Sequence, residues 1–322
     1  MGRYLVVRLS GGLVTIAILS LLVFGLLRVV GGDPALLLLA ERMPEGDASQ
    51  VDPVELLELQ RMMGTDKPIV EQYAVWVGQL LTFDLGNSII TDQPIGDEIR
   101  LRFPYTFQLA LVSVALGAMI GLTLGILAAV KQDTWIDYVA RVFMIVGISM
   151  PSFWTGTLVI FSLLVVFHWF PPLGYALIWQ DPAVALQQLL WPCLILGYAL
   201  SAIISRLTRS QMLEVLRQDY IRTAWSKGLS SRAILVRHAL RNAILPIMTI
   251  LGIQFAFMLG GTVIIESIFV IPGMGSAFIA GLAGRDFPMV QNIVMLFSVI
   301  ILVMNLMIDL MYSVVDPRIR FN

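Results

Sequence analysis

The sequence predicts an all-α polytopic membrane protein with six transmembrane helices. Of its 322 residues, 58% are hydrophobic and 13% are charged, whereas a soluble domain carries about 25% charged residues. A helix that crosses a bilayer needs about 20 apolar residues, and hydrocarbon cannot satisfy bare backbone amides outside a helix or barrel. Six stretches without Asp, Glu, Lys or Arg are long enough: 9–27, 103–130, 142–170, 182–205, 242–265 and 287–308.

The first stretch follows Arg3 and Arg8, as the core of a signal peptide would. Its apolar run is longer than such a core and no convincing small-residue cleavage site follows, so we expect a retained helix. Basic residues favour the cytoplasmic side of a membrane. With the N-terminus inside, six helices put the C-terminus inside too, and only Arg285 falls in the short outer loops. The basic residues then inside are Arg3, Arg8, Lys131, Arg141, those of 206–241, Arg318 and Arg320.

The long segment 31–102 is expected to lie outside, because long loops escape the charge rule. It holds 13 acidic against 5 basic residues and contains amphipathic stretches such as PVELLELQRMMG and IVEQYAVWVGQLL. A solvated acidic linker is one interpretation. The apolar faces favour short helices that pack on the membrane domain or on a protein docking from outside. The sequence thus divides into 1–102, the first helix with this loop, and 103–322, the membrane domain.

Small residues that recur every four positions, together with one proline, are candidates for helix packing or gating. A face of small residues lets helices approach closely in lipid, and it suits static packing and moving contacts alike. A proline inside a membrane helix removes a backbone hydrogen bond and kinks the helix. These residues are Gly117, Gly121 and Gly125, Gly252, Ala256 and Gly260, and Pro151.

The sequence does not assemble the residues that enzymes use for phosphate, metal or nucleophile chemistry. None of its three lysines completes GxxxxGK[ST], and His168 and His238 lie far apart and form no HExxH. Cys193 lies in an apolar run, where a small buried hydrophobe is expected. We therefore expect no catalytic residues, no metal and no cofactor bound by this chain, and we expect no nucleic-acid partner.

Three polar residues near the ends of the last two helices are possible pathway or interface residues. Ionisable groups at membrane depth are functional candidates by default, but Glu266 and Asp309 are expected near the outer and inner interfaces, within reach of water. Asn305 and Asp309 are four residues apart and share a helix face, so they can bond to a neighbouring helix. A structural role is the simpler interpretation for all three.

The loop 206–245 carries eight basic residues up to Arg241 against only Glu214 and Asp219. A topology anchor explains the sign of this charge but not its arrangement. Asp219 is suited to cap a helix over 220–227, Gly228 to end it, and Ser230 or Ser231 to cap the next. A short helix held outside the membrane between two spans is suited to contact a soluble partner.

The same stretch, DYIRTAWSKGLSSRAILVRHALRNAILP, closely resembles the cytoplasmic EAA loop of permease subunits in binding-protein-dependent ABC importers. More narrowly it resembles the dipeptide, oligopeptide and nickel permeases, as do TDKPIVEQYAVWVGQLLTFDLGNSI, FPYTFQLAL, GISMPSFWTG and ESIFVIPGMG, and RDFPMVQ and DPRIR further on. The resemblance covers nearly the whole chain, including the long loop of the B-type subunit. Arg222, Thr223 and Arg241 depart from the general EAA pattern, so a Glu-based contact to an ATPase is not expected.

The resemblance implies a type I ABC importer permease in the bacterial inner membrane, with both termini cytoplasmic. It implies a second homologous permease as heterodimer partner, two ATPase subunits that bind ATP and Mg, and an external substrate-binding protein. Short peptides are the expected substrate, with glutathione, nickel complexes and opine-like compounds as alternatives. Residues 220–229 would form the coupling helix, and Ala224 and Gly228 its closest ATPase contacts. The coupling residues carried over are Asp219, Tyr220, Arg222, Thr223, Ala224, Lys227, Gly228 and His238.

Two other classes of protein remain open on the sequence. A stand-alone secondary transporter or channel for small solutes would need its own coupling-ion site or inverted repeats, and neither is evident. A non-transporting membrane scaffold fits the interpretation of the basic loop as an anchor, and Arg222 and Lys227 could then contact lipid headgroups instead of an ATPase.

Overall fold

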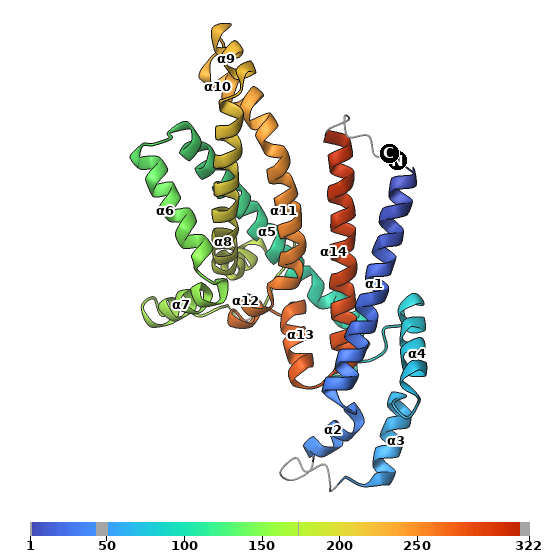
Figure 1. The fold of residues 1–322 in the computed structure, drawn as a ribbon. Helices are drawn as coiled ribbons and strands as arrows, with labels where there is room; N and C mark the ends of the chain where they lie inside the picture. Colours follow the sequence, from blue (N-terminus) through green and yellow to red (C-terminus); the bar gives the residue numbers. More distant parts are fainter. Residues whose placement is uncertain (1, 43–50, 173, 316–322) are drawn as a thin grey trace. The chain divides into compact units, whose positions relative to one another are not determined.

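The computed structural model describes residues 2–42, 51–172 and 174–315 (Figure 1). Arg318, Arg320 and the DPRIR segment lie outside this described part. The described chain divides into two compact units, one of residues 2–103 and 276–302 and the other of residues 104–275 and 303–315. The basic loop, Glu266 and all the residues proposed above for packing or gating lie in the second unit.

The first unit confirms the short amphipathic helices expected within 31–102. Its helix α4 packs against α1 and α14, where Trp76 clusters with Phe24 and Met295, and the hydroxyls of Ser20 on α1 and Tyr73 on α4 are 2.8 Å apart. The apolar face of α4 therefore has a partner within the chain. The helices of this unit are α1 (Gly2–Gly31), α2 (Pro34–Arg42), α3 (Pro53–Met63), α4 (Ile69–Leu81), the start of α5 (Ile95–Val130), all but the first two residues of α13 (Met274–Ala283) and the first part of α14 (Phe287–Val315).

The second unit is arranged around α8, which has the largest buried share of the apolar helices. Helix α8 (Pro182–Leu216) contacts both α6 (Trp135–Ser149) and α11 (Arg241–Gly261) (Figure 1). Its N-terminus is capped by Asp181, whose carboxylate accepts from the amides of Ala183 and Val184. The unit also contains most of α5 (Ile95–Val130), α7 (Ser152–Val165), α12 (Val263–Ile268) and the end of α14.

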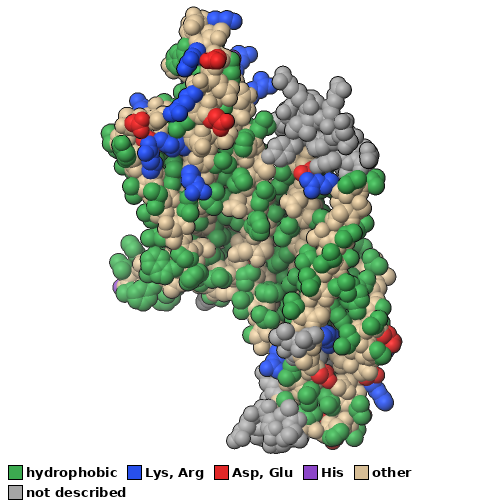
Figure 2. Space-filling model, in the orientation of Figure 1, with side chains coloured by type: hydrophobic (Ala, Val, Ile, Leu, Met, Phe, Trp, Pro, Cys, Tyr) green, Lys and Arg blue, Asp and Glu red, His purple; other side chains and the backbone are tan. Residues whose placement is uncertain are grey.

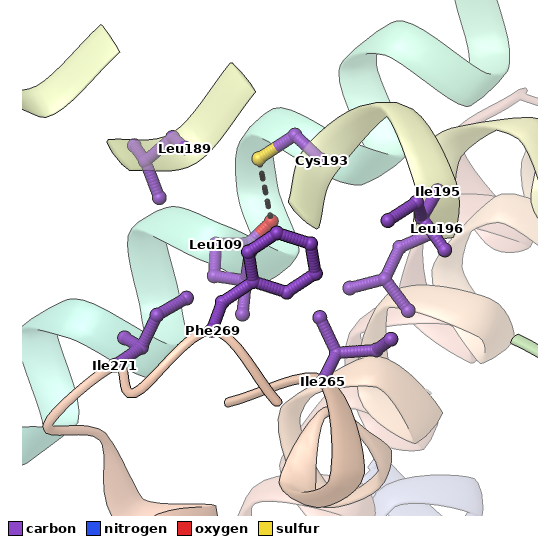
Figure 3. Packing of buried hydrophobic residues seen from close by; sticks show 8 residues of the cluster. All are labelled: Leu109, Leu189, Cys193, Ile195, Leu196, Ile265, Phe269 and Ile271. Carbon is purple, nitrogen blue, oxygen red and sulfur yellow. Dashed lines mark hydrogen bonds between the residues drawn. The ribbon is translucent and has the colours of Figure 1, made fainter. Parts of the chain in front are cut away.

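A hydrophobic core joins α5, α8 and the segment that follows α12 (Figure 3). Phe269 points from that segment toward Leu109 on α5 and toward α8, and it is 2% exposed. Cys193 is fully buried beside it, and its thiol donates to the carbonyl oxygen of Leu109 at 3.7 Å. The expectation that Cys193 is a small buried hydrophobe is confirmed.

The glycine repeat of α5 lies directly against α8. A Cβ added at Gly117 would lie 3.0 Å from the carbonyl oxygen of Gly197, and one at Gly125 would lie 2.7 Å from that of Ser205. Between them, Gly121 accepts a 3.1 Å hydrogen bond at its own carbonyl from the Ser205 hydroxyl. The two backbones approach so closely only because these positions lack side chains.

The seam between α5 and α8 makes Gly125 a sensitive position. Gly125→Val is expected to destabilise the folded protein by about 1–3 kcal/mol or more, because the new methyls meet backbone that cannot rotate away. Thermal unfolding in detergent measures this. Gly25→Val on α1 is the matched control, since a Cβ there meets nothing within 4 Å. Equal unfolding temperatures for the two variants would contradict the close contact between the backbones of α5 and α8.

The second small-residue repeat is also a contact. A Cβ at Gly252 would lie 2.7 Å from Cγ1 of Ile308 on α14, and Ala256 is 2% exposed. Gly260 is half-buried one residue before the end of α11. Whether either glycine repeat also moves during function stays a prediction.

Pro151 does more than kink the third predicted helix. The helix ends at Ser149, and α6 and α7 meet at 99° around Met150 and Pro151. Met150 adopts extended backbone angles, φ −92° and ψ 119°, as the residue before a proline must to avoid the ring. The prediction of one continuous helix over 142–170 is therefore wrong, and this span is a broken pair.

The other predicted spans are confirmed as helices, and most run longer than predicted, but the span predicted over 242–265 ends at Gly261, before the separate helix α12. Five described helices are long and apolar enough to cross a membrane, or six if the pair α6 and α7 counts as one span. Helix α8 runs 11 residues past the predicted end at Ser205, and the helix that contains α11 begins at Ser231. The polar extensions were missed because charge ended the apolar stretches before the backbone left the helix.

Candidate functional site

The site built from the basic loop is a helical elbow, residues 217–240, between α8 and α11. It contains α9 (Asp219–Ser226), the single turn α10 (Ser231–Ala233) and the π-helical segment η3 (Ile234–Leu240). Within the second unit it projects past the ends of α8 and α11 (Figure 1), and Lys and Arg side chains gather over it and over the adjoining end of α6 (Figure 2).

The helix caps and turns predicted for the elbow are found in the structure, apart from one N-cap. Gly228 has φ +76°, a left-handed conformation that glycine adopts without cost, and its amide donates to the Trp225 carbonyl at 2.9 Å. Ser230 caps the next turn by accepting from the Ala233 amide at 3.4 Å. The N-cap of α9 is Gln218, not Asp219, which is already the first helical residue. As an acidic residue in the first turn, Asp219 still favours the helix dipole.

A small core holds the two arms of the elbow together. Ile221 and Ile234 are fully buried and Ala224 is 7% exposed, and Leu216 at the end of α8 packs against them. The side chain of Ala224 thus points into the elbow, so the prediction that it makes one of the closest contacts to an ATPase needs correction. Its small size permits the turn to close on itself instead.

The base of the elbow is fixed to three spans. Met212 and Val215 of α8, Ala129 of α5, Ala239 of η3 and Ala243 of α11 form one buried cluster. The amide of Asn242 also donates to the Tyr220 hydroxyl at 2.7 Å, which ties α9 to the start of α11. Because packed interiors transmit displacement, a force on α9 reaches α5, α8 and α11.

The outer face of the elbow is apolar as well as basic. Tyr220, Trp225 and Leu229 are 38%, 49% and 39% exposed, and Arg222, Thr223, Lys227 and Gly228 are exposed beside them. Sequence reasoning selected the basic and small residues and missed Trp225 and Leu229. The available signal was a tryptophan outside every apolar stretch, because exposed aromatic residues mark protein interfaces.

The π-helical segment was also missed. Seven residues, Ile234–Leu240, run with the wider spacing between the capped turn and α11, and such segments occur often at functional sites. Arg237 is exposed and His238 half-buried within it. His238, which was proposed as a coupling residue, thus lies where the elbow joins α11.

The sequence suggested that Glu266 lies within reach of water, but the structure shows its side chain fully buried. Its Oε1 accepts from the hydroxyls of Thr106 at 2.7 Å and Thr262 at 2.9 Å, and its Oε2 accepts from the Gly275 amide at 2.8 Å. The Thr106 hydroxyl in turn accepts from the amide of Met274 at 2.8 Å. This network fastens the ESIFVIPGMG segment to the start of α5 in the second unit.

The polar pair of α14 is less enclosed. Asn305 is exposed and Asp309 half-buried, one helical turn apart. Asp309 takes part in a further interaction in the described chain. Their placement agrees with a shared face, and a role in a pathway or an interface stays a prediction.

A buried ion cluster at the end of α8 was not expected from the sequence. Asp137 on α6 is fully buried and accepts from Arg209 Nε and Nη2 at 2.7 and 2.9 Å. Arg141 donates to the same carboxylate, and to Asp133 at 3.3 Å. Sequence spacing finds the pair one turn apart on α6, but not Arg209, which is 72 residues away.

No group of three or more His, Cys, Asp or Glu side chains suited to a metal ion occurs in the described ranges. The elbow itself offers an apolar and basic face on a short helix, with a buried core linked to three spans.

The chain is similar to known transport proteins over nearly its whole length. Residues 121–321 match the family described as binding-protein-dependent transport system inner membrane component, and residues 1–110 match its N-terminal family. A Brucella abortus (strain 2308) protein named as a peptide transport system permease is 36% identical over 98% of both chains. The glutathione transport system permease protein of Escherichia coli (strain K12) is 35% identical over 99% of both chains.

A solved structure shares the fold. The inward-facing MetNI methionine ABC transporter contains a chain that matches with a TM-score of 0.57 at 16% identity, over 70% of this chain and 99% of the other. The expected all-α permease architecture is thereby confirmed.

Proposed function

We propose that ATP-hydrolysing partner subunits move this chain by pushing on the elbow. The chain belongs to the family of binding-protein-dependent transport system inner membrane components. It is thus the permease of an ABC importer and not a stand-alone transporter or channel. The observation that carries this proposal is the elbow itself, whose outer face is exposed and whose inner face is packed onto α5, α8 and α11.

The proposed mechanism is a transfer of motion. Trp225 and Tyr220 sit in a cleft of an ATPase subunit, with Arg222 and Lys227 on its acidic or carbonyl groups. Closure of two ATPases around ATP displaces α9, and the buried cluster around Ile221 carries that displacement to the spans, which open outward. Hydrolysis resets them. The chain needs no phosphate-binding loop because the nucleotide and its Mg are held by the partners.

The proposed assembly contains two homologous permeases, two ATPases and an external binding protein. Both termini and the elbow of this chain lie in the cytoplasm, as the basic residues favour, and the chain supplies half of the translocation pathway. Short peptides are the proposed substrate class. The names of the two relatives, one of a peptide system and one of a glutathione system, support this proposal.

A reconstituted importer tests the proposed function. The chain is purified with the products of neighbouring genes, and ATP hydrolysis is measured with candidate binding proteins, each with and without di- to hexapeptides, glutathione or a nickel complex. We expect one binding protein to stimulate hydrolysis, and a short peptide to raise it further. Substrate uptake without any ATPase partner would contradict the proposal.

The acidic segment 31–102 is proposed to dock the binding protein. Glu55 and Glu58 are exposed on α3, and complementary charge mainly sets the rate and specificity of encounter. Glu55→Lys with Glu58→Lys is expected to raise the half-maximal binding-protein concentration for ATPase stimulation roughly tenfold at low salt, and to leave basal hydrolysis unchanged. An unchanged stimulation curve, in this variant and after deletion of α3, would refute docking by this segment.

A further inference from the structure

A groove of about 840 Å³ lies between α6 and α8, at the end of the second unit that carries the elbow. Four arginines line it, Arg141, Arg206, Arg209 and Arg217, with Met144 and Ile145 among its apolar residues and Glu214 as its only lining carboxylate. Neither the family nor the proposed coupling role of the elbow assigns a ligand to this groove.

The buried carboxylate of Asp137 orients two of these arginines. Arg209 uses Nε and Nη2 on Asp137, so the rest of its five N–H donors remain for another acceptor. Arg141 donates to the same carboxylate and to Asp133, and it lies over the Tyr138 ring at 5.2 Å. Asp137 is thus a positioning residue, fully buried behind the groove and not part of its lining.

The other two arginines are exposed, Arg206 on α8 and Arg217 directly after its last residue. In the described part of the chain, neither Arg206 nor Arg217 makes an ion pair within 4.0 Å. The antiparallel pairing of α6 and α8, with Gly147 against Ala202 and Asp137 against Arg209, brings Arg206 level with Arg141. Arg217 lies 11 residues further, about 16 Å along the helix. The groove therefore offers an anion site at Arg141 and Arg206, and a second cation beyond it.

The groove borders a surface suited to lipid. On the outer face of α6, Val142 and Ile145 are 60% and 64% exposed, and Trp135 and Tyr138 near its start are 74% and 55% exposed. Figure 2 shows hydrophobic side chains over α6 and α7 below the charged end. Exposed aliphatic residues that give way to Trp and Tyr are typical of a helix that meets a membrane interface.

We propose that this groove binds the phosphate of an anionic phospholipid, with an acyl chain against the exposed side chain of Ile145. Guanidinium groups bind phosphate oxygens in bidentate fashion, and basic pockets between membrane helices on the cytoplasmic side suit lipid headgroups. The apolar wall one turn deeper than Arg141 distinguishes a lipid phosphate from a free phosphate ion. The anionic lipid would hold α6 against α8 at the root of the elbow.

Native mass spectrometry of the importer purified with its partner subunits tests the assignment. The complex is exchanged into micelles that contain phosphatidylglycerol or phosphatidylcholine, and retained lipid is counted. We expect clear retention of phosphatidylglycerol over phosphatidylcholine. Arg206→Gln with Arg217→Gln is expected to reduce that preference roughly 25-fold, since each surface arginine contributes about fivefold toward an anionic lipid. Arg100→Gln, an exposed arginine outside the groove, is expected to change nothing.

Each other outcome overturns the assignment. Equal retention of the two lipids would contradict the assignment. A preference for phosphatidylglycerol that the double variant keeps would contradict it too. Displacement of phosphatidylglycerol by inorganic phosphate would assign the groove to a free anion. If the double variant loses an ATPase or permease subunit while its lipid preference is kept, the groove is a protein contact. Folding is monitored by the thermal unfolding of each variant, because both substituted arginines are exposed and should not alter it.

Discussion

Gly228→Trp is expected to abolish transport while the protein remains folded and inserted. The glycine has φ +76°, and a Cβ there meets nothing within 4 Å. A non-glycine residue in this conformation costs about 1–2 kcal/mol, which is small against a typical stability of about 5–15 kcal/mol. The indole would therefore project from the elbow into the space proposed for an ATPase. Peptide uptake into vesicles that contain the full importer measures the effect.

Two matched substitutions separate contact from backbone strain. Gly228→Asn keeps the left-handed turn with a small side chain, so we expect most of the uptake to remain. Gly174→Trp places the same ring on another left-handed glycine with open space around it, φ +87°, away from the elbow, and should transport normally. Loss of uptake in all three variants would point to strain, and normal uptake with Gly228→Trp would remove the elbow from the coupling mechanism.

Glu266→Ala is expected to cause a large loss of stability, about 3–5 kcal/mol. The substitution leaves two buried hydroxyls, on Thr106 and Thr262, and one buried amide, on Gly275, without the acceptor they now share, and each such group costs about 1–3 kcal/mol. Thermal unfolding of the purified importer, followed by fluorescence, reports the change. Transport should fall with it, because the ESIFVIPGMG segment loses its fastening to α5.

Glu266→Gln is the informative companion. Its amide oxygen can still accept from both threonines, whereas its NH2 group meets the Gly275 amide, another donor. We expect stability between wild type and alanine. If the alanine variant unfolds at the wild-type temperature, the network is not what holds this segment, and the carboxylate would have to serve transport directly.

Apolar length was enough to predict the spans, because a bilayer imposes one requirement on every crossing segment. The sequence could not show that Pro151 turns the chain through 99°, since the angle depends on what α7 packs against. Gly156 lies against α12, where a Cβ would be 2.9 Å from Cδ1 of Ile265. That neighbour is more than 100 residues along the chain.

The burial of Glu266 and Asp137 was beyond the sequence for the same reason. Glu266 is bonded to Thr106, 160 residues away, and Asp137 to Arg209, 72 residues away. Local spacing identifies a charged residue near a helix end, but only the tertiary contacts decide whether it meets water or a protein hydroxyl. From the sequence, Glu266 was therefore expected near water, and Asp137 was not selected.

The elbow was the most predictable part of the candidate site, because caps and turns are local. Gly228 and Ser230 occupy the positions expected of them, while the N-cap differs by one residue, as helix ends commonly do. The inward direction of Ala224 could not be foreseen, since it depends on Ile234 returning from the other arm. Selecting basic and small residues left out Trp225, the largest exposed apolar side chain of the elbow.

A photo-crosslinking amino acid at Trp225 tests the central proposal most directly. This side chain is 49% exposed on α9, and in the assembled importer it should react with an ATPase subunit, with a yield that changes between ATP-bound and nucleotide-free states. Crosslinks to phospholipid alone, or a yield indifferent to nucleotide in an importer that still transports, would contradict the elbow as the element through which ATP hydrolysis moves the spans.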